Sequence, residues 1–356
     1  MTTLLAEELK AKFGLAGRRA FVPKHKTIRF VAPALKEEEK RFYDKWIVRN
    51  STEQEEIATY EQGSHQWKYS RRYRITGSKF AAAVGHSDYE TPDQVVDEML
   101  VSTFQGNAAT RRGNKLEPKA CAYLLERERR TVNLELELAK QEGRSFIRYA
   151  HREFPIPAHF SGEALTIRHR GLVICPDAPW IAASSDGEIY LFGQRIGVAE
   201  YKCPKSNRFY PLTPAYYFDQ IQGNMHIAKV GFCLLGVYTT QPDKPMLVEH
   251  IEYDKEYCEE FLMPSLNQFW FQKVLPRALE FEAALALKAA TTATAQSALP
   301  DTSCFQQLTL PFVRASVADS KKKPIGSSTR KRKVSSEKPP KTEPTRRRFK
   351  RPSFLT

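Results

Sequence analysis

Residues 196–202 read Ile-Gly-Val-Ala-Glu-Tyr-Lys, an apolar run that ends in an acid, an aromatic residue and a lysine. Such a run predicts a β-strand, and side chains on a strand alternate between the two faces of its sheet. Glu200 and Lys202 are therefore expected on one face, with Tyr201 on the other. Asp186, within Ser185-Asp186-Gly187, adds a second carboxylate on strand-like sequence upstream.

This combination of acids and a lysine is typical of metal-dependent phosphodiester hydrolysis. A hard cation such as Mg²⁺ prefers oxygen ligands, which Asp186, Glu200 and the backbone carbonyl of Tyr201 could provide. Lys202 would then act on the attacking water. We favour positioning over proton abstraction, because a lysine ammonium is ordinarily charged at neutral pH. Two simpler explanations compete: Asp-Gly is a common hairpin turn, and Glu-x-Lys is common on the solvated face of a strand.

Five short motifs decide between these explanations by their order and approximate spacing. They are Trp67-Lys68 with Arg71, Arg72 and Arg74-Ile75-Thr76-Gly77-Ser78; Arg112-Gly113-Asn114-Lys115-Leu116-Glu117; Ser185-Asp186-Gly187; Glu200-Tyr201-Lys202-Cys203-Pro204; and Tyr216-Tyr217-Phe218-Asp219-Gln220-Ile221-Gln222-Gly223-Asn224-Met225. Together they resemble the YqaJ and lambda-exonuclease family of viral recombination nucleases, within the restriction-endonuclease-like fold of the PD-(D/E)xK superfamily. Gly77 stands where the family usually has alanine. The resemblance spans about residues 60–250.

The resemblance implies a catalytic and metal-binding set. Glu117, Asp186, Glu200 and the Tyr201 carbonyl would hold Mg²⁺, with Mn²⁺ as a possible substitute, and Gln220 would line the site beside Lys202. Two of these assignments have simpler alternatives. Asn114 and Glu117 have the spacing of a helix capping box. The helix that carries Gln220 also has an ordinary core face.

The resemblance also implies a binding site for a terminal 5′-phosphate. Counting back from Ser78, the family's phosphate-binding arginine matches Arg71 best, and Ser78 is its expected partner. Arg72 and Arg74 are further candidate DNA contacts. The alternative for all three arginines is ordinary surface charge.

The implied activity is that of a 5′-to-3′ exonuclease on the ends of double-stranded DNA. The resemblance further implies a ring-shaped homotrimer and a single-strand annealing protein as a partner. Two other functions stay open: a structure-selective endonuclease with the same active site, and a non-catalytic DNA-binding protein that retains the fold. The presence of both acids and the lysine favours an enzyme.

The charge of the chain is concentrated at its C-terminal end. Residues 321–356 contain 14 Lys and Arg against Glu337 and Glu343, so they hold +12 of the net +14. A nuclease body must therefore bind DNA through a local groove rather than a generally cationic surface. Such composition predicts a disordered tail, and the cluster Arg330–Lys333 favours a nuclear import signal. A clamp-binding peptide at Gln307–Phe312 is a less favoured hypothesis than a chance apolar patch.

The remaining composition indicates an intracellular protein. Six cysteines occur singly, without a C-x-x-C pair, which is typical of reduced thiols in a reducing compartment. No apolar run is long enough to span a membrane, and no signal peptide is recognisable.

Periodicity predicts an α+β fold in which helices flank a central mixed β-sheet. The family resemblance implies that this fold has a restriction-endonuclease-like core. Helices are expected at about 37–60, 78–84, 91–99, from Asn114, at 215–228 and at 255–288. Strands are expected from Thr131 to Tyr201, where Leu134-Glu135-Leu136-Glu137-Leu138 alternates, and at 232–239 and 246–253. The predicted organisation is an N-terminal extension of unassigned role (1–36), a nuclease domain (37–288), a linker (289–320) and the basic tail (321–356).

Overall fold

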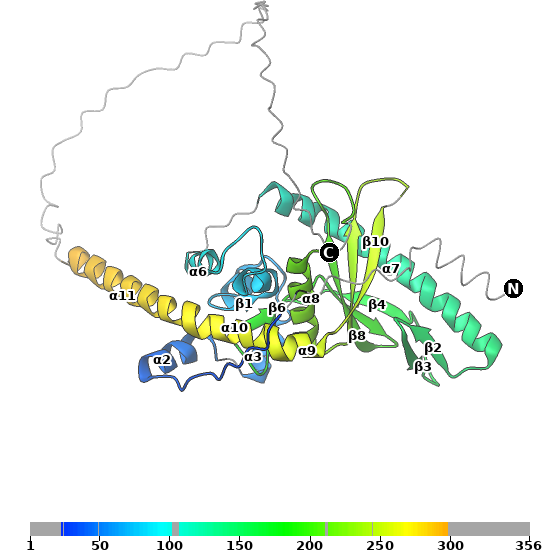
Figure 1. Cartoon of the computed structure of the whole chain (residues 1–356), viewed down its shortest axis with the longest axis horizontal. Coiled ribbons are helices and arrows are strands. Elements are labelled where there is room, and N and C mark those ends of the chain that lie inside the picture. Colours follow the sequence, from blue (N-terminus) through cyan, green and yellow to red (C-terminus); the bar gives the residue numbers. More distant parts are fainter. Residues whose placement is uncertain are drawn as a thin grey trace, which may run out of the picture. The chain divides into compact units, whose positions relative to one another are not determined.

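The centre of the fold is a five-stranded mixed sheet in the order β10-β9-β8-β7-β4. Its strands are β4 (Leu165–Arg168), β7 (Gly187–Leu191), β8 (Gln194–Lys202), β9 (Phe232–Tyr238) and β10 (Met246–Glu252). Only β8 and β9 run parallel, and α8 (Ala215–Ala228) makes the crossover between them. The predicted sheet with flanking helices is confirmed (Figure 1).

The two faces of this sheet pack against different helices. Val198 on β8 and Leu235 on β9 belong to the same buried cluster as Phe218, Ile221 and Met225 of α8. Their neighbours Ala199, Tyr201 and Leu234 instead pack with Leu124 and Val132 of α7 (Ala108–Glu142). The strand alternation expected from residues 196–202 is therefore present, with α8 on one face and α7 on the other.

Two smaller β elements complete the strands. β1 (Ile75–Thr76), β6 (Ile181–Ala183) and β5 (Val173–Ile174) form a three-stranded sheet in which β1 and β6 run parallel. β2 (Phe146–Tyr149) and β3 (Arg152–Pro155) form a hairpin. The β1–β6 pairing brings the arginine-rich segment beside the strand that leads into Asp186.

The N-terminal part of the domain is made mainly of short helices. They are α2 (Glu37–Trp46), α3 (Ser51–Ile57), α4 (His65–Ser70), the 3₁₀ turn η1 (Gly77–Lys79), α5 (Phe80–Ala83) and α6 (Pro92–Leu100). The predicted start of α6 at Thr91 is confirmed, because the Thr91 side chain accepts a hydrogen bond from the backbone N–H of Gln94.

A continuous helical rod closes the domain. It consists of α9 (Lys255–Tyr257), η2 (Cys258–Leu262), α10 (Met263–Phe269), η3 (Trp270–Val274) and α11 (Leu275–Ser297) (Figure 1). Trp270 is fully buried, stacks on Trp180 with ring centroids 5.0 Å apart, and donates its indole N–H to the carbonyl of Tyr73. The end of the expected N-terminal extension also contacts the rod, because the N–H of Ile28 donates to the carbonyl of Glu260.

This computed structural model describes residues 23, 25–48, 50–101, 107–210, 213–243 and 245–297. Most of the N-terminal extension, the basic tail with Arg330–Lys333, and Gln307–Phe312 lie outside the described residues and stay predictions from sequence. Among the described helices, none has the length and apolar character needed to cross a bilayer. The five cysteines in the described part of the chain are free thiols.

The prediction of strands from Thr131 onward is wrong for its first twelve residues. α7 continues to Glu142 and ends where Gly143 adopts a left-handed conformation with φ of 64°. Buried positions Leu124, Glu128 and Val132 follow helical spacing, and Leu and Glu are strong helix formers. The alternating leucines misled the prediction because Leu134 is exposed rather than core. The last helix, expected at about 255–288, continues as α11 to Ser297.

Gly223 and Gly113, which both lie within helices, allow a matched test of how closely α8 packs against α5. A methyl group at Gly223 on α8 would overlap the ring of the fully buried Phe80 on α5, whereas one at Gly113 on α7 meets nothing within 4 Å. We expect Gly223→Ala to lower the free energy of unfolding by about 1–3 kcal/mol because overpacking a core is unfavourable. Gly113→Ala should raise it by about 0.5–1 kcal/mol, because alanine is the better helix former.

Denaturant unfolding followed by circular dichroism measures both effects. Equal shifts in the two variants would contradict the close approach of α8 to α5.

Candidate active site

Two carboxylates face each other at the end of the β7–β8 hairpin. Gly187 pairs with Ala199, so Asp186 comes just before the paired segment and Glu200 just after it on the partner strand. The carboxylate of Asp186 accepts a hydrogen bond of 2.7 Å from the backbone N–H of Tyr201. Asp186 therefore does not lie in a hairpin turn, because β6 and β7, which flank it, belong to different sheets.

Glu200 is the most tightly held of these acids, with only 2% of its surface exposed. Lys202 donates to its Oε1 at 2.6 Å, and the amide of Gln220 donates to the same oxygen at 2.7 Å. Lys202 also donates to Oε1 of Gln220 at 3.0 Å, which closes a three-membered ring of contacts. The structure thus brings together Glu200, Lys202 and Gln220, as the sequence predicted.

Burial, followed by mutual repulsion among the acids, governs the electrostatics of this site. Burial raises the pKa of Asp186 well above its ordinary value, and the neighbouring charge of Glu200 raises it further. Burial alone would lower the pKa of Lys202, but Glu200 and Asp186 outweigh it, so the pKa of Lys202 rises. Lys202 is accordingly an ammonium that donates hydrogen bonds, consistent with the positioning role.

Glu117 approaches the same group of charges from α7. Its pKa is raised first by burial and then by Glu200, while His169 and Lys202 oppose the shift. The alternative explanation of Asn114 and Glu117 as a capping box is excluded, because α7 begins at Ala108 with Asn107 as its N-cap. Glu117 therefore lies inside a long helix, and helix capping does not account for it.

Asn224 is a site residue that the sequence analysis missed. One turn after Gln220 on α8, its amide donates to Oε2 of Glu200 at 3.2 Å. Its own Oδ1 is buried and has no hydrogen-bond partner among the described residues. A Cβ at Gly77 would lie 2.6 Å from that Oδ1. Gly77, which stands where the family usually has alanine, therefore makes room for Asn224. In the sequence, this glycine was visible only as a single departure from the family motif, with nothing to link it to Asn224.

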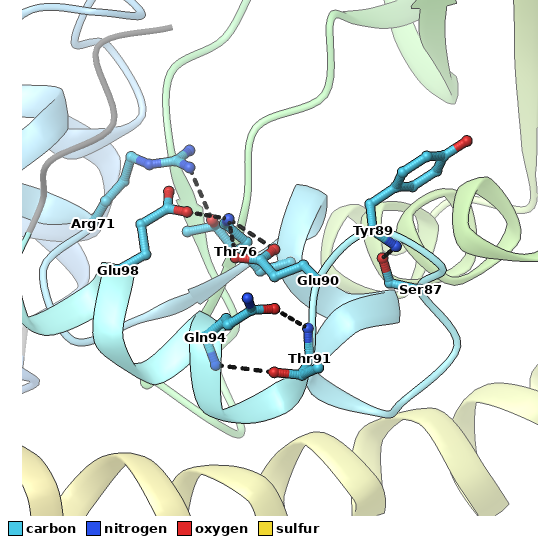
Figure 2. A network of polar contacts seen from close by, with 9 residues as sticks. Arg71, Thr76, Ser87, Tyr89, Glu90, Thr91, Gln94 and Glu98 are labelled. Carbon is cyan, nitrogen blue, oxygen red and sulfur yellow. Dashed lines mark hydrogen bonds and ion pairs between the residues drawn. The ribbon is translucent and has the colours of Figure 1, made fainter. Parts of the chain in front are cut away.

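Arg71 belongs to a network of polar contacts that includes Thr76 (Figure 2). Its guanidinium donates to Oγ1 of Thr76 at 2.9 Å and stacks 4.2 Å from the ring centre of Trp67. Burial lowers the pKa of Arg71 to about 10, so it stays charged at neutral pH. Ser78 is exposed on η1, two residues after Thr76. Both residues thus lie close to Gly77 and α8.

Arg72 and Arg74 both have partners within the fold, and their role as DNA contacts stays a prediction. Arg74 is 2% exposed, and its guanidinium donates to the backbone carbonyls of Ile47, Ser70 and Pro179. Arg72 pairs with Glu282 on α11 at 2.9 Å and stacks on Trp46. Both guanidinium groups hold the fold together, and this use of arginine cannot be distinguished from phosphate binding in the sequence alone.

A divalent cation fits the chemistry of this donor set. Asp186 and Glu200 are opposed, and Glu117, Asp186 and Glu200 repel one another, with Lys202 and His169 as the nearby groups that oppose this repulsion. Among the described residues, no three His, Cys, Asp or Glu side chains are already close enough to share one ion. Glu200 is held instead by Lys202, Gln220 and Asn224. A hollow of about 520 Å³ beside the β2–β3 hairpin contains none of these residues.

Comparison with known proteins shows a similarity in one part of the chain. A sequence profile described as the YqaJ-like viral recombinase domain matches residues 66–150. The match confirms the resemblance inferred from the motifs, and it includes Arg71, Ser78 and Glu117. Asp186, Glu200, Lys202 and Gln220 lie beyond the matched residues, and their assignment depends on the geometry described above.

Two solved structures resemble the chain. They are LHK-Exo, an alkaline exonuclease from Laribacter hongkongensis, and LHK-Exo in complex with dAMP. Each is 20% identical, and the alignment covers 64% of this chain and 100% of the other, with TM-scores of 0.42 and 0.43 respectively. No curated protein matches the chain in sequence.

Gly77 and Asn224 should be energetically coupled. Gly77→Ala displaces the Asn224 amide from Glu200, and we expect it to lower the free energy of unfolding by about 1–3 kcal/mol because a buried charge loses a donor. In the double variant Gly77→Ala/Asn224→Ala the clash is gone, so the two effects should be non-additive by about 1 kcal/mol or more.

Urea unfolding of the wild type, both single variants and the double variant measures the coupling. Strict additivity would contradict the steric link between the two residues.

Proposed function

We propose that this protein is a Mg²⁺-dependent deoxyribonuclease, and that it acts as a 5′-to-3′ exonuclease on the ends of double-stranded DNA. The observation that carries the proposal is the pair of opposed carboxylates Asp186 and Glu200 at the end of β7–β8, with Lys202 held 2.6 Å from Glu200. The YqaJ-like match in residues 66–150 independently supports a nuclease.

In the proposed mechanism, Glu117, Asp186, Glu200 and the Tyr201 carbonyl hold the metal. When bound, Mg²⁺ supplies Lewis-acid polarisation of the scissile phosphate. Lys202 has three N–H donors, of which two point to Glu200 and Gln220. The remaining donor can orient the attacking water or a phosphate oxygen. Gln220 and Asn224 fix the carboxylate of Glu200 so that it stays in place during turnover.

Arg71 and Ser78 are the proposed contacts to the 5′-phosphate of the substrate. A charged guanidinium suits a phosphate, and stacking on Trp67 restricts the orientations that Arg71 can adopt. The proposal extends to a ring-shaped homotrimer and an annealing partner, which the family resemblance alone supports, and to nuclear localisation, which the basic cluster Arg330–Lys333 supports.

Removal of the acids should abolish cleavage without loss of DNA binding. We expect Asp186→Asn and Glu200→Gln each to lower the rate of Mg²⁺-dependent cleavage by about 10²–10³-fold, because electrostatic catalytic groups contribute on this scale. Affinity for DNA in Ca²⁺ should change little. Glu137→Gln, on an exposed position of α7, is the control and should leave both quantities unchanged.

End-labelled duplex resolved on denaturing gels measures the cleavage rate. Full activity in Glu200→Gln would remove Glu200 from the mechanism. A protein that binds DNA but shows no metal-dependent cleavage would favour the non-catalytic alternative.

Substitution of Arg71 and Arg72, one at a time, distinguishes a role in phosphate binding from a role in folding. Wild-type protein should degrade 5′-phosphorylated duplex faster than 5′-hydroxyl duplex, and Arg71→Ala should erase this difference. Arg72→Ala should keep the preference, because Arg72 pairs with Glu282, although its unfolding midpoint should fall. Initial rates on the two duplexes measure the preference. An unchanged preference in Arg71→Ala would contradict the assignment.

A further inference from the structure

Tyr89 is an exposed aromatic side chain on the loop that joins α5 to α6. Its exposed fraction is 78%, higher than that of any other exposed aromatic residue in the described part of the chain. Its phenol ring points away from the polar contacts of Glu90 and Thr91 (Figure 2). An isolated exposed tyrosine needs no functional explanation. Tyr89 differs from such a residue because contacts connect its loop to the proposed active site.

The loop that presents Tyr89 is fixed on both sides. Before it, the ring of His86 contacts the buried carboxylate of Asp219, the residue that precedes Gln220 on α8, at 3.0 Å. After it, Glu90 pairs with Lys79, the residue that follows Ser78, at 2.8 Å. The loop is thus tied to the two segments that carry the proposed catalytic and phosphate-binding residues.

A series of aromatic rings leads from Tyr89 to the proposed catalytic lysine. The ring of Tyr89 meets that of Tyr216 edge-on with centroids 5.5 Å apart, and Tyr216 meets Tyr217 at 4.5 Å. The Tyr217 ring lies 4.7 Å from Nζ of Lys202. Tyr217 is fixed in turn by contact between its hydroxyl and that of Tyr210 at 3.1 Å. The rings form a continuous path from the surface to the site.

Such a path suits a strand of nucleic acid. Bases of any sequence stack on aromatic rings, while a phosphate of the same strand can lie beside a lysine. A strand whose phosphate is bound at Lys202 would bring a nearby base over the exposed end of the path. A base inside a duplex already stacks on both neighbours, so an unpaired base offers its flat face to a tyrosine most readily.

We propose that Tyr89 is a stacking platform for an unpaired base of the DNA strand held in the active site. The inference deepens the proposed function and rests on it, because Lys202 is the group that positions the phosphate of that strand. It identifies the bound ligand class as a locally single-stranded DNA segment rather than an intact duplex.

The test is equilibrium binding in Ca²⁺, with a short duplex that carries a single-stranded 5′ overhang. We expect Tyr89→Ala to weaken this binding by about 5- to 100-fold, the range for loss of one base–aromatic stack. Tyr89→Phe should bind like the wild type, because the ring is retained. Tyr123→Ala, which removes another exposed tyrosine on α7, is the matched control and should be unchanged.

An abasic scan of the overhang identifies the stacked base. At one position, removal of the base should weaken DNA binding by the wild type. Removal of the same base should not weaken binding by Tyr89→Ala any further. 2-Aminopurine at that position should be quenched by the wild type and by Tyr89→Phe, but not by Tyr89→Ala. Equal affinities of wild type and Tyr89→Ala, or an abasic effect that is the same in both, would overturn the inference.

The outcome can be distinguished from failure of the proposed function, because binding in Ca²⁺ requires no cleavage. If Glu200→Gln abolishes cleavage but Tyr89→Ala binds normally, the nuclease assignment stands and the stacking role falls. If Tyr89 is required for binding but no metal supports cleavage, the stacking role stands and the nuclease assignment falls.

Discussion

The burial of the Glu200 carboxylate is the constraint on which the site depends. An ionised carboxylate with 2% of its surface exposed is unfavourable unless charge and hydrogen bonds compensate it. Lys202 supplies the charge, and Gln220 and Asn224 supply two amide donors. Two of these four residues lie on β8 and two on α8, so compensation of the buried charge requires α8 to lie close over the end of β8.

Close packing around α8 follows from that requirement. Gly223 allows the buried Phe80 ring to lie against the helix, and Gly77 leaves room for the Asn224 amide. The segment from Arg71 to Phe80 is thereby fixed against the helix that holds Glu200. A catalytic site needs such fixed surroundings, because small displacements of positioned groups reduce rates strongly. The same packing places Arg71 and Ser78 near the proposed reacting centre.

Much of the fold and of the site could be predicted from the sequence. The alternation at residues 196–202, the helix at 215–228 and the strands at 232–239 and 246–253 follow from periodicity, and the structure contains them. The features that could not be predicted depend on packing between segments that are far apart in the sequence. Leu134–Leu138 alternates like a strand, yet the buried positions on either side keep α7 helical. Arg72 and Arg74 carry the residue type of a phosphate site, but the carbonyls and the acid that occupy them come from distant segments. Asn224 was missed because its partner Glu200 is 24 residues away.

The central claim is that the opposed carboxylates support metal-dependent hydrolysis at DNA ends. The most direct measurement is incubation of the protein with equimolar linear duplex and covalently closed circular DNA in Mg²⁺, with EDTA as the comparison. The account predicts that the linear duplex is degraded to mononucleotides in Mg²⁺ only, while the circle stays intact. Absence of cleavage of either DNA with Mg²⁺ or Mn²⁺ would contradict it.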